Sequence, residues 1–100
     1  MSHMPEHDDP QDKALLALVR GRVQGVGFRY EARSFARALG IRGWIMNLSD
    51  GGVETYAEGP PSAIARYQAW LWQGPPGAHV ESVDINERVP KGTYTTFIIE

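Results

Sequence analysis

The chain has 100 residues, of which 42% are hydrophobic, 22% charged and 10% aromatic, and its formal net charge is −2. This length allows one domain with one core, and this composition is typical of a folded globular protein rather than a disordered one. The absence of cysteine excludes disulfides, iron–sulfur clusters, thiolate zinc sites and a cysteine nucleophile, and no apolar run reaches the roughly 20 residues of a membrane helix.

Residues 1–12 are expected to form a disordered tail, and residues 13–100 the folded domain. The tail carries His3, His7 and several acids, and its first four residues resemble a remnant of an expression vector. His79 is then the only histidine of the folded part, which leaves little support for a histidine metal site. We expect a monomer in the cytoplasm, with no metal, no cofactor and no membrane association.

The first predicted element is a strand over residues 14–23, whose mainly apolar start is typical of a central strand. The glycine-rich residues 24–27 follow and are predicted to form a loop. From Phe28 to Leu39, apolar residues recur with the spacing of one helical face, and Gly40 follows where a helix usually ends.

Two strands are predicted next, over residues 41–48 and 53–57, and an Asp-Gly turn between them indicates a β-hairpin. A second helix follows, for which Ser62 is the predicted N-cap and Gly74 marks the end. The last predicted strands lie around residues 80–85 and over residues 93–99, which are rich in β-branched and aromatic residues.

This order of elements predicts an α+β, ferredoxin-like fold: a split βαβ arrangement (βαββαβ) with a short final strand. We expect an antiparallel sheet with both helices on one face and the other face partly open. Many unrelated functions use this layout, so the fold alone does not indicate an activity.

Positive charge is concentrated between residues 20 and 42, where six arginines stand against one acid, Glu31. Such a stretch is expected to attract an anion, and a small anion fits better than a long nucleic acid because no second basic patch accompanies it. The alternative is a solvated basic helix face.

The stretch VRGRVQGVGFRY, residues 19–30, is the most informative part of the sequence. A strand that runs through a glycine-rich loop into a helix directs backbone N–H groups toward one point, so it can form an anion cradle. Gly25 and Gly27 allow positive φ and a close approach of the main chain. The loop has neither the Lys-Ser/Thr ending of a nucleotide P-loop nor the spacing of a dinucleotide fingerprint.

Arg29 strengthens this interpretation. A cation in the first turn of a helix lies at the unfavourable end of the dipole, at a cost of about 0.3 to 1 kcal/mol. A bound phosphate would offset that cost, because the planar guanidinium matches two phosphate oxygens. Arg29 as a plain surface residue, one turn before Arg33, is the alternative.

Two segments of this sequence resemble the signatures of the acylphosphatases. The first consists of Val19, Gly21, Val23, Gly25, Val26, Phe28 and Arg29. The second is GWIMNLSDGGV, residues 43–53, with Gly59 beyond it, and its one departure is Ile45, where that family more often has a smaller residue.

The resemblance implies an enzyme that hydrolyses the carboxyl–phosphate bond of small acyl phosphates to a carboxylate and inorganic phosphate. It implies that phosphate, or sulfate in its place, is bound by the Arg29 side chain and the loop backbone, and that Asn47 orients the attacking water. The expected phosphate-binding residues are Gln24, Gly25, Val26, Gly27, Phe28 and Arg29. From its position alone, Asn47 could instead satisfy the backbone of the following turn.

The remaining aromatic and acidic residues have structural interpretations. Trp44, Trp70 and Trp72 are expected to pack rather than to stack on bases, and Glu54 and Glu58 to be solvated strand charges. An RNA-binding module shares the order of elements, but its third strand would need more aromatics than Tyr56. An acyl phosphate sensor and a module of a larger maturation protein stay open as alternatives.

Overall fold

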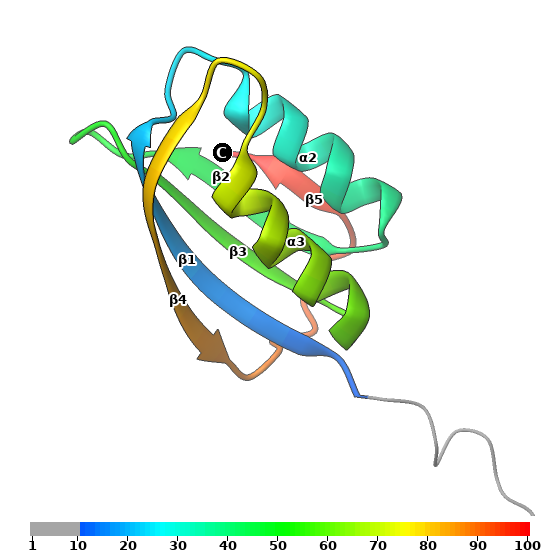
Figure 1. Ribbon diagram of the computed structural model, residues 1–100. Helices are drawn as coiled ribbons and strands as arrows, with labels where there is room; N and C mark the ends of the chain where they lie inside the picture. The colour runs from blue at the N-terminus through cyan, green and yellow to red at the C-terminus, as the bar shows by residue number, and fades with distance from the viewer. Residues whose placement is uncertain (1–10) are drawn as a thin grey trace, which may run out of the picture.

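A computed structural model describes residues 11–100, so residues 1–10 of the predicted tail lie outside the described part. Five strands and two helices follow one another in the predicted order (Figure 1). They are β1 (Lys13–Arg22), α2 (Phe28–Ala38), β2 (Arg42–Asn47), β3 (Val53–Gly59), α3 (Pro61–Gln73), β4 (His79–Arg88) and β5 (Phe97–Ile99).

The five strands form one sheet in the order β4-β1-β3-β2-β5. The first four pair antiparallel with their neighbours, which confirms the predicted α+β, ferredoxin-like fold. β5 differs from the predicted all-antiparallel sheet because it pairs in parallel with β2, through Gly43–Phe97, Trp44–Ile98 and Ile45–Ile99.

The register explains why β5 is parallel. Arg88 at the end of β4 pairs with Ala14, Ala14 pairs with Glu58, and Glu58 pairs with Arg42, so these residues lie in one row across the sheet. The chain leaves β4 at this end of the sheet and crosses to the edge beside the start of β2. A strand that begins there has to run in the same direction as β2.

The final strand is shorter than the predicted span of residues 93–99. The preceding segment contacts the open face of the sheet: the N–H of Lys91 donates to the Glu58 carboxylate at 3.0 Å, and the Tyr94 ring lies 5.5 Å from that of Tyr56. Residues held on that face are not available to extend an edge strand, so the strand begins only at Phe97.

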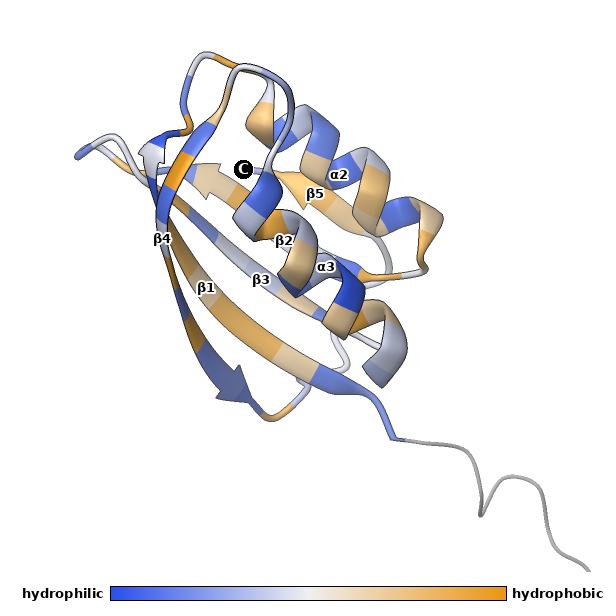
Figure 2. Cartoon of the chain, in the orientation of Figure 1, coloured by the Kyte–Doolittle hydropathy of each residue, from blue (hydrophilic) through white to orange (hydrophobic). Residues whose placement is uncertain are grey.

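Both helices cover one face of the sheet (Figure 1), as predicted. The core lies between them and the sheet, and the apolar colouring of β1 in Figure 2 marks part of its floor. Phe28, Ala32 and Ala36 bury one side of α2, and Tyr67 and Leu71 bury one side of α3. The hydroxyl of the fully buried Tyr67 shares a hydrogen bond of 2.8 Å with Thr55, and burial raises the Tyr67 pKa well above its ordinary value.

The prediction that Ser62 caps the second helix is wrong. α3 begins at Pro61, so its N-cap position is Pro60 rather than Ser62, and it has no side-chain cap. Proline suits the first helical position because its fixed φ matches the helix and its missing N–H would have had no helical partner. Proline therefore determines where this helix starts.

Candidate active site

The loop between β1 and α2 reverses the chain through two glycines with left-handed backbone. Gly25 has φ 76° and Gly27 has φ 80°. A Cβ at either position would meet nothing within 4 Å, so it is the backbone conformation and not a lack of space that requires glycine there. Both glycines therefore serve the path of the main chain, as predicted.

The loop leads directly into the first turn of α2. The helix begins at Phe28, and no side chain caps it. The N–H of Glu31 donates to the Gly27 carbonyl at 3.0 Å and makes the first hydrogen bond of the helix. The earlier N–H groups of a helix have no partner within the helix itself. Together with the positive end of the helix dipole, they form a site that favours an anion.

Arg29 lies in this first turn and is partly buried. Within residues 11–100, no acidic side chain lies within 4.0 Å of its guanidinium. The charge of Arg29 is thus not neutralised by the described protein, at a helix end where a cation is unfavourable.

Most of the other arginines between residues 20 and 42 contact groups of the protein itself. Three of its arginines make structural contacts: Arg20 pairs with Asp50, Arg37 donates to the carbonyl of Phe97, and Arg42 pairs with Asp12 and Glu58. Arg33 lies over the ring of Tyr30, 5.4 Å from its centre. The six arginines therefore do not form one anion-binding surface.

Asn47 is the last residue of β2 and is exposed. It lies on the same strand face as Ile45, which is completely buried in the core, so it is on the helix-covered face of the sheet. Ile45 itself fills the core, so the departure from the family pattern concerns packing.

The β2–β3 turn is closed without Asn47. Leu48 N–H donates to the Gly52 carbonyl at 2.8 Å, Gly51 N–H to the Leu48 carbonyl at 3.2 Å, and Gly52 N–H to Asp50 Oδ1 at 3.0 Å. That last bond and the Arg20 guanidinium hold the pKa of Asp50 below its ordinary value. The turn thus leaves the Asn47 side chain free for another role.

Gln24 joins the loop to this turn. Its side-chain Nε2 donates to the Leu48 carbonyl at 2.7 Å and to the Gly52 carbonyl at 2.9 Å. The structure thereby brings the loop, the first turn of α2 and the end of β2 together at one end of the sheet, opposite to the end at which β1 begins (Figure 1). The sequence did not predict this side-chain contact.

Two of the three tryptophans, Trp70 and Trp44, pack as predicted. The Trp70 ring lies 5.2 Å from that of Phe28 and 5.8 Å from that of Phe35, so it links the two helices. Trp44 stacks on Tyr56 at 6.4 Å, whereas Trp72 is half exposed. His79 is exposed at the start of the edge strand β4.

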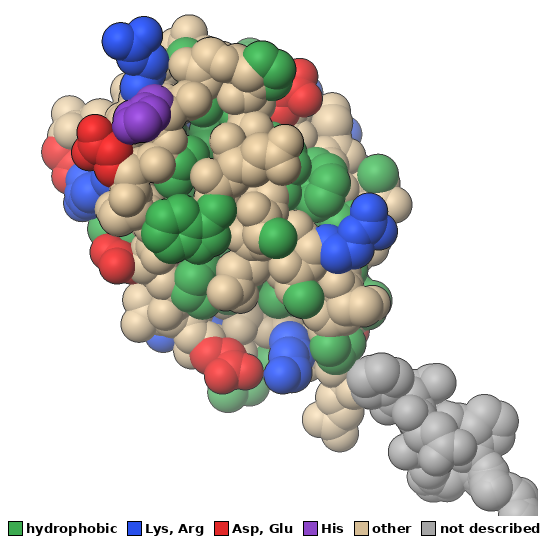
Figure 3. All heavy atoms as spheres, viewed as in Figure 1, with side chains coloured by type: hydrophobic (Ala, Val, Ile, Leu, Met, Phe, Trp, Pro, Cys, Tyr) green, Lys and Arg blue, Asp and Glu red, His purple; other side chains and the backbone are tan. Residues whose placement is uncertain are grey.

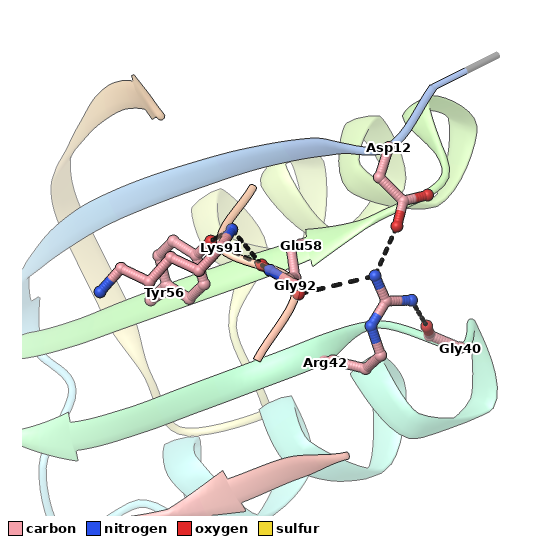
Figure 4. A network of polar contacts seen from close by, with 7 residues as sticks. All are labelled: Asp12, Gly40, Arg42, Tyr56, Glu58, Lys91 and Gly92. Atoms are coloured by element: carbon pink, nitrogen blue, oxygen red, sulfur yellow. Dashed lines mark hydrogen bonds and ion pairs between the residues drawn. The ribbon is translucent and has the colours of Figure 1, made fainter. Parts of the chain in front are cut away.

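Glu58 contradicts the prediction that it is a solvated charge. It is completely buried, and its Oε1 accepts hydrogen bonds from the Tyr56 hydroxyl and from the N–H groups of Lys91 and Gly92 (Figure 4). Arg42 lies 3.7 Å from the other carboxylate oxygen. Burial alone would raise the pKa of Glu58, but these bonds and the Arg42 charge outweigh it and hold the pKa below its ordinary value. The crossing segment that buries Glu58 comes from far along the chain, and the local pattern gave no signal of it.

The family model described as acylphosphatase matches residues 15–99, nearly all of the described chain. The chain belongs to the acylphosphatase family. An acylphosphatase of Roseiflexus sp. (strain RS-1) is 46% identical over 81 residues, which are 81% of this chain and 87% of that protein.

Solved structures agree with this assignment to the acylphosphatases. An acylphosphatase from Coxiella burnetii superimposes with a TM-score of 0.85 at 39% identity, over 89% of this chain and 93% of that one. Full-length HypF, in a phosphate- and nucleotide-bound form, matches with a TM-score of 0.82 at 28% identity, over 91% of this chain and 12% of HypF. Similarity therefore extends to stand-alone acylphosphatases and to one part of a much larger protein.

Family membership makes this chain an enzyme that acts on small-molecule acyl phosphates. Residues 11–100 include no helix that is both long and apolar enough to cross a membrane. The same residues hold no group of three or more His, Cys, Asp or Glu side chains that could bind a metal ion. The groups that the loop, the first turn of α2 and the end of β2 present are the Arg29 guanidinium, the Asn47 side-chain amide and the main-chain N–H groups of the loop.

Proposed function

We propose that the phosphoryl group of an acyl phosphate is bound by the Arg29 guanidinium and by the main-chain N–H groups of Gln24 to Arg29, and that Asn47 orients the attacking water. The observation that supports this most directly is the pair of hydrogen bonds from Gln24 to the β2–β3 turn, since they hold the anion cradle against the end of the strand that carries Asn47. The cradle supplies charge and donors, and Asn47 supplies a side chain that both donates and accepts.

The uncompensated charge of Arg29 fits this role. A phosphate at the start of α2 would pair with the guanidinium and with the partial positive charge of the helix end at once. The fork of guanidinium donors also fixes the orientation of a phosphate, which a lysine ammonium would not do.

The acyl phosphate suits a site with so few groups. Water attacks phosphorus, the bond from phosphorus to the bridging oxygen breaks, and the leaving group departs as a carboxylate that needs no proton at neutral pH. Positioning and charge stabilisation can then supply most of the rate enhancement. A phosphoryl oxygen accepts the proton of the attacking water, so that no side-chain base is required.

An RNA-binding function would need exposed aromatic rings on the central strands of the open face. Tyr56, the only aromatic residue of β3, is 2% exposed and lies under Tyr94 and Lys91. The helix-covered face in Figure 3 shows charged side chains scattered around its margin and no continuous basic track. These observations favour a small anion.

The test is turnover of a simple aryl acyl phosphate by the purified chain, with release of inorganic phosphate as the readout. We expect hydrolysis that persists in excess chelator. Binding of phosphate without hydrolysis would indicate a sensor instead of an enzyme. If chelator abolished activity and added Mg²⁺ restored it, a mechanism based on side chains and backbone alone would be contradicted.

A further inference from the structure

We infer that the side chain of Gln24 is a positioning residue, which fixes the end of β2 that carries Asn47 against the phosphate-binding loop. This inference rests on the proposed function, because it assigns no contact between the Gln24 side chain and the substrate. The main-chain N–H groups of the loop bind the anion. The Gln24 side chain sets the distance between that anion and the Asn47 amide, which orients the water.

The two hydrogen bonds of Gln24 use both protons of its side-chain amide. One goes to the Leu48 carbonyl at 2.7 Å and the other to the Gly52 carbonyl at 2.9 Å. Since both partners are acceptors only, the nitrogen and not the oxygen of this amide has to face the turn. The bonds span 24 and 28 residues of sequence and are partly buried, so they join separate elements in a place partly protected from water.

These bonds are not needed to form the turn itself. The Leu48 and Gly52 carbonyls already accept main-chain N–H groups from within the turn, from Gly51 and Leu48 respectively. Gln24 therefore occupies a second acceptor position on each carbonyl. What it adds is a fixed placement of the whole turn relative to the loop.

Asn47 directly precedes Leu48, whereas Gln24 is itself part of the loop between β1 and α2. One side chain thus ties together the two halves of the proposed active site. Strand pairing already places the backbone of Asn47, which pairs with Val53, itself paired with Val19 of β1. The side-chain contact from Arg20 to Asp50, at 2.9 Å, is exposed and contributes little to holding the turn in place. Gln24 is therefore the partly buried side-chain contact that fixes the turn after Asn47 against the loop.

The first test replaces Gln24 with Met, which has similar length and no amide donors. We expect kcat for an aryl acyl phosphate to fall about 10- to 100-fold, since a displacement of about 1 Å can cost 10²-fold in rate. The Kd for inorganic phosphate is expected to stay within about threefold, because the loop N–H groups and Arg29 are retained. Gln73→Met makes the same chemical change at an exposed position at the end of α3 and is expected to leave kcat unchanged.

A double-mutant cycle with Asn47→Ala separates positioning from a general structural effect. If Gln24 acts through Asn47, then adding Gln24→Met to Asn47→Ala should lower kcat by less than about threefold further. Additive losses, or a phosphate Kd weakened as much as kcat, would overturn the positioning role and leave the proposed function standing. A kcat of Asn47→Ala equal to that of the wild type would overturn both.

Unfolding of Gln24→Met would be detected by circular dichroism. In that case the same cycle is run with Gln24→Ala, which removes the amide without placing an apolar group against two carbonyls. A kcat for the folded Gln24 variant within twofold of the wild type would refute the inference.

Discussion

The hydroxyl of Tyr56 donates to Glu58 Oε1 at 2.7 Å, and both side chains are buried on the sheet face that carries no helix. This pair lies beneath the segment that crosses from β4 to β5, whose Lys91 and Gly92 N–H groups bind the same oxygen. Burial, and then the bond to Glu58, raise the pKa of Tyr56 to about 12. The Glu58 carboxylate thus holds the crossing segment on the sheet through these hydrogen bonds.

Glu58→Gln is expected to destabilise the fold by about 1–3 kcal/mol at neutral pH, because buried donors lose a charged acceptor. The folded pKa of Glu58 lies below its ordinary value of 4.5, so its contribution is complete above that value and is lost as pH falls through the folded pKa. Thermal unfolding at pH 7 and at acid pH should show that the stability difference between Glu58→Gln and the wild type becomes smaller as the pH falls. Glu54→Gln, on the same face of β3 and only partly buried, is the control and should change little at either pH.

Arg29→Ala is expected to lower kcat by about 10³-fold or more, by analogy with catalytic arginines on phosphoryl groups. Binding of inorganic phosphate should weaken as well, since the guanidinium is proposed to contact the bound anion. Steady-state kinetics and phosphate titration measure the two effects. Arg33→Ala removes an arginine one turn further along α2, and its kcat should stay near that of the wild type; a tenfold or smaller loss for Arg29→Ala would reject the proposed role.

Asn47→Ala is expected to lower kcat by about 10²-fold or more, comparable with the removal of one donor from an oxyanion site. Affinity for inorganic phosphate should be nearly retained, because the anion is held by the loop and not by Asn47. Asn86→Ala, at an exposed position of β4, is the matched control. Loss of phosphate binding in Asn47→Ala would mean that this amide holds the anion and does not orient water.

Gly43→Ala is expected to destabilise the pairing of β2 with β3. Gly43 has φ 147°, and a Cβ there would lie 2.0 Å from the Tyr56 carbonyl oxygen, so the backbone would have to move. Strained backbone alone costs about 1–3 kcal/mol, and the clash adds to it. Gly59→Ala provides the comparison, since its Cβ would meet atoms only at ordinary contact distances of 3.5 Å and more. Denaturant unfolding of both variants should show a much larger loss for Gly43.

The sequence by itself determined the order of the elements, the α+β layout and the position of the glycine loop before α2. These features depend on local periodicity and on residues such as Gly25 and Gly27, whose backbone preferences act over a few positions. The loop, Arg29 and Asn47 could be predicted because they lie in two short sequence segments that resemble the family signatures. Whether these residues perform the proposed roles stays a prediction.

The tertiary structure alone decided how distant residues meet. Gln24 reaches the turn after Asn47, β5 runs parallel to β2, and Glu58 is buried by a segment more than 30 residues away. A local sequence pattern predicts which face of a strand a residue occupies. It does not predict which distant segment of the chain will cover that face. Burial and hydrogen bonding are set by contacts across the sheet, and those exist only once the chain has folded.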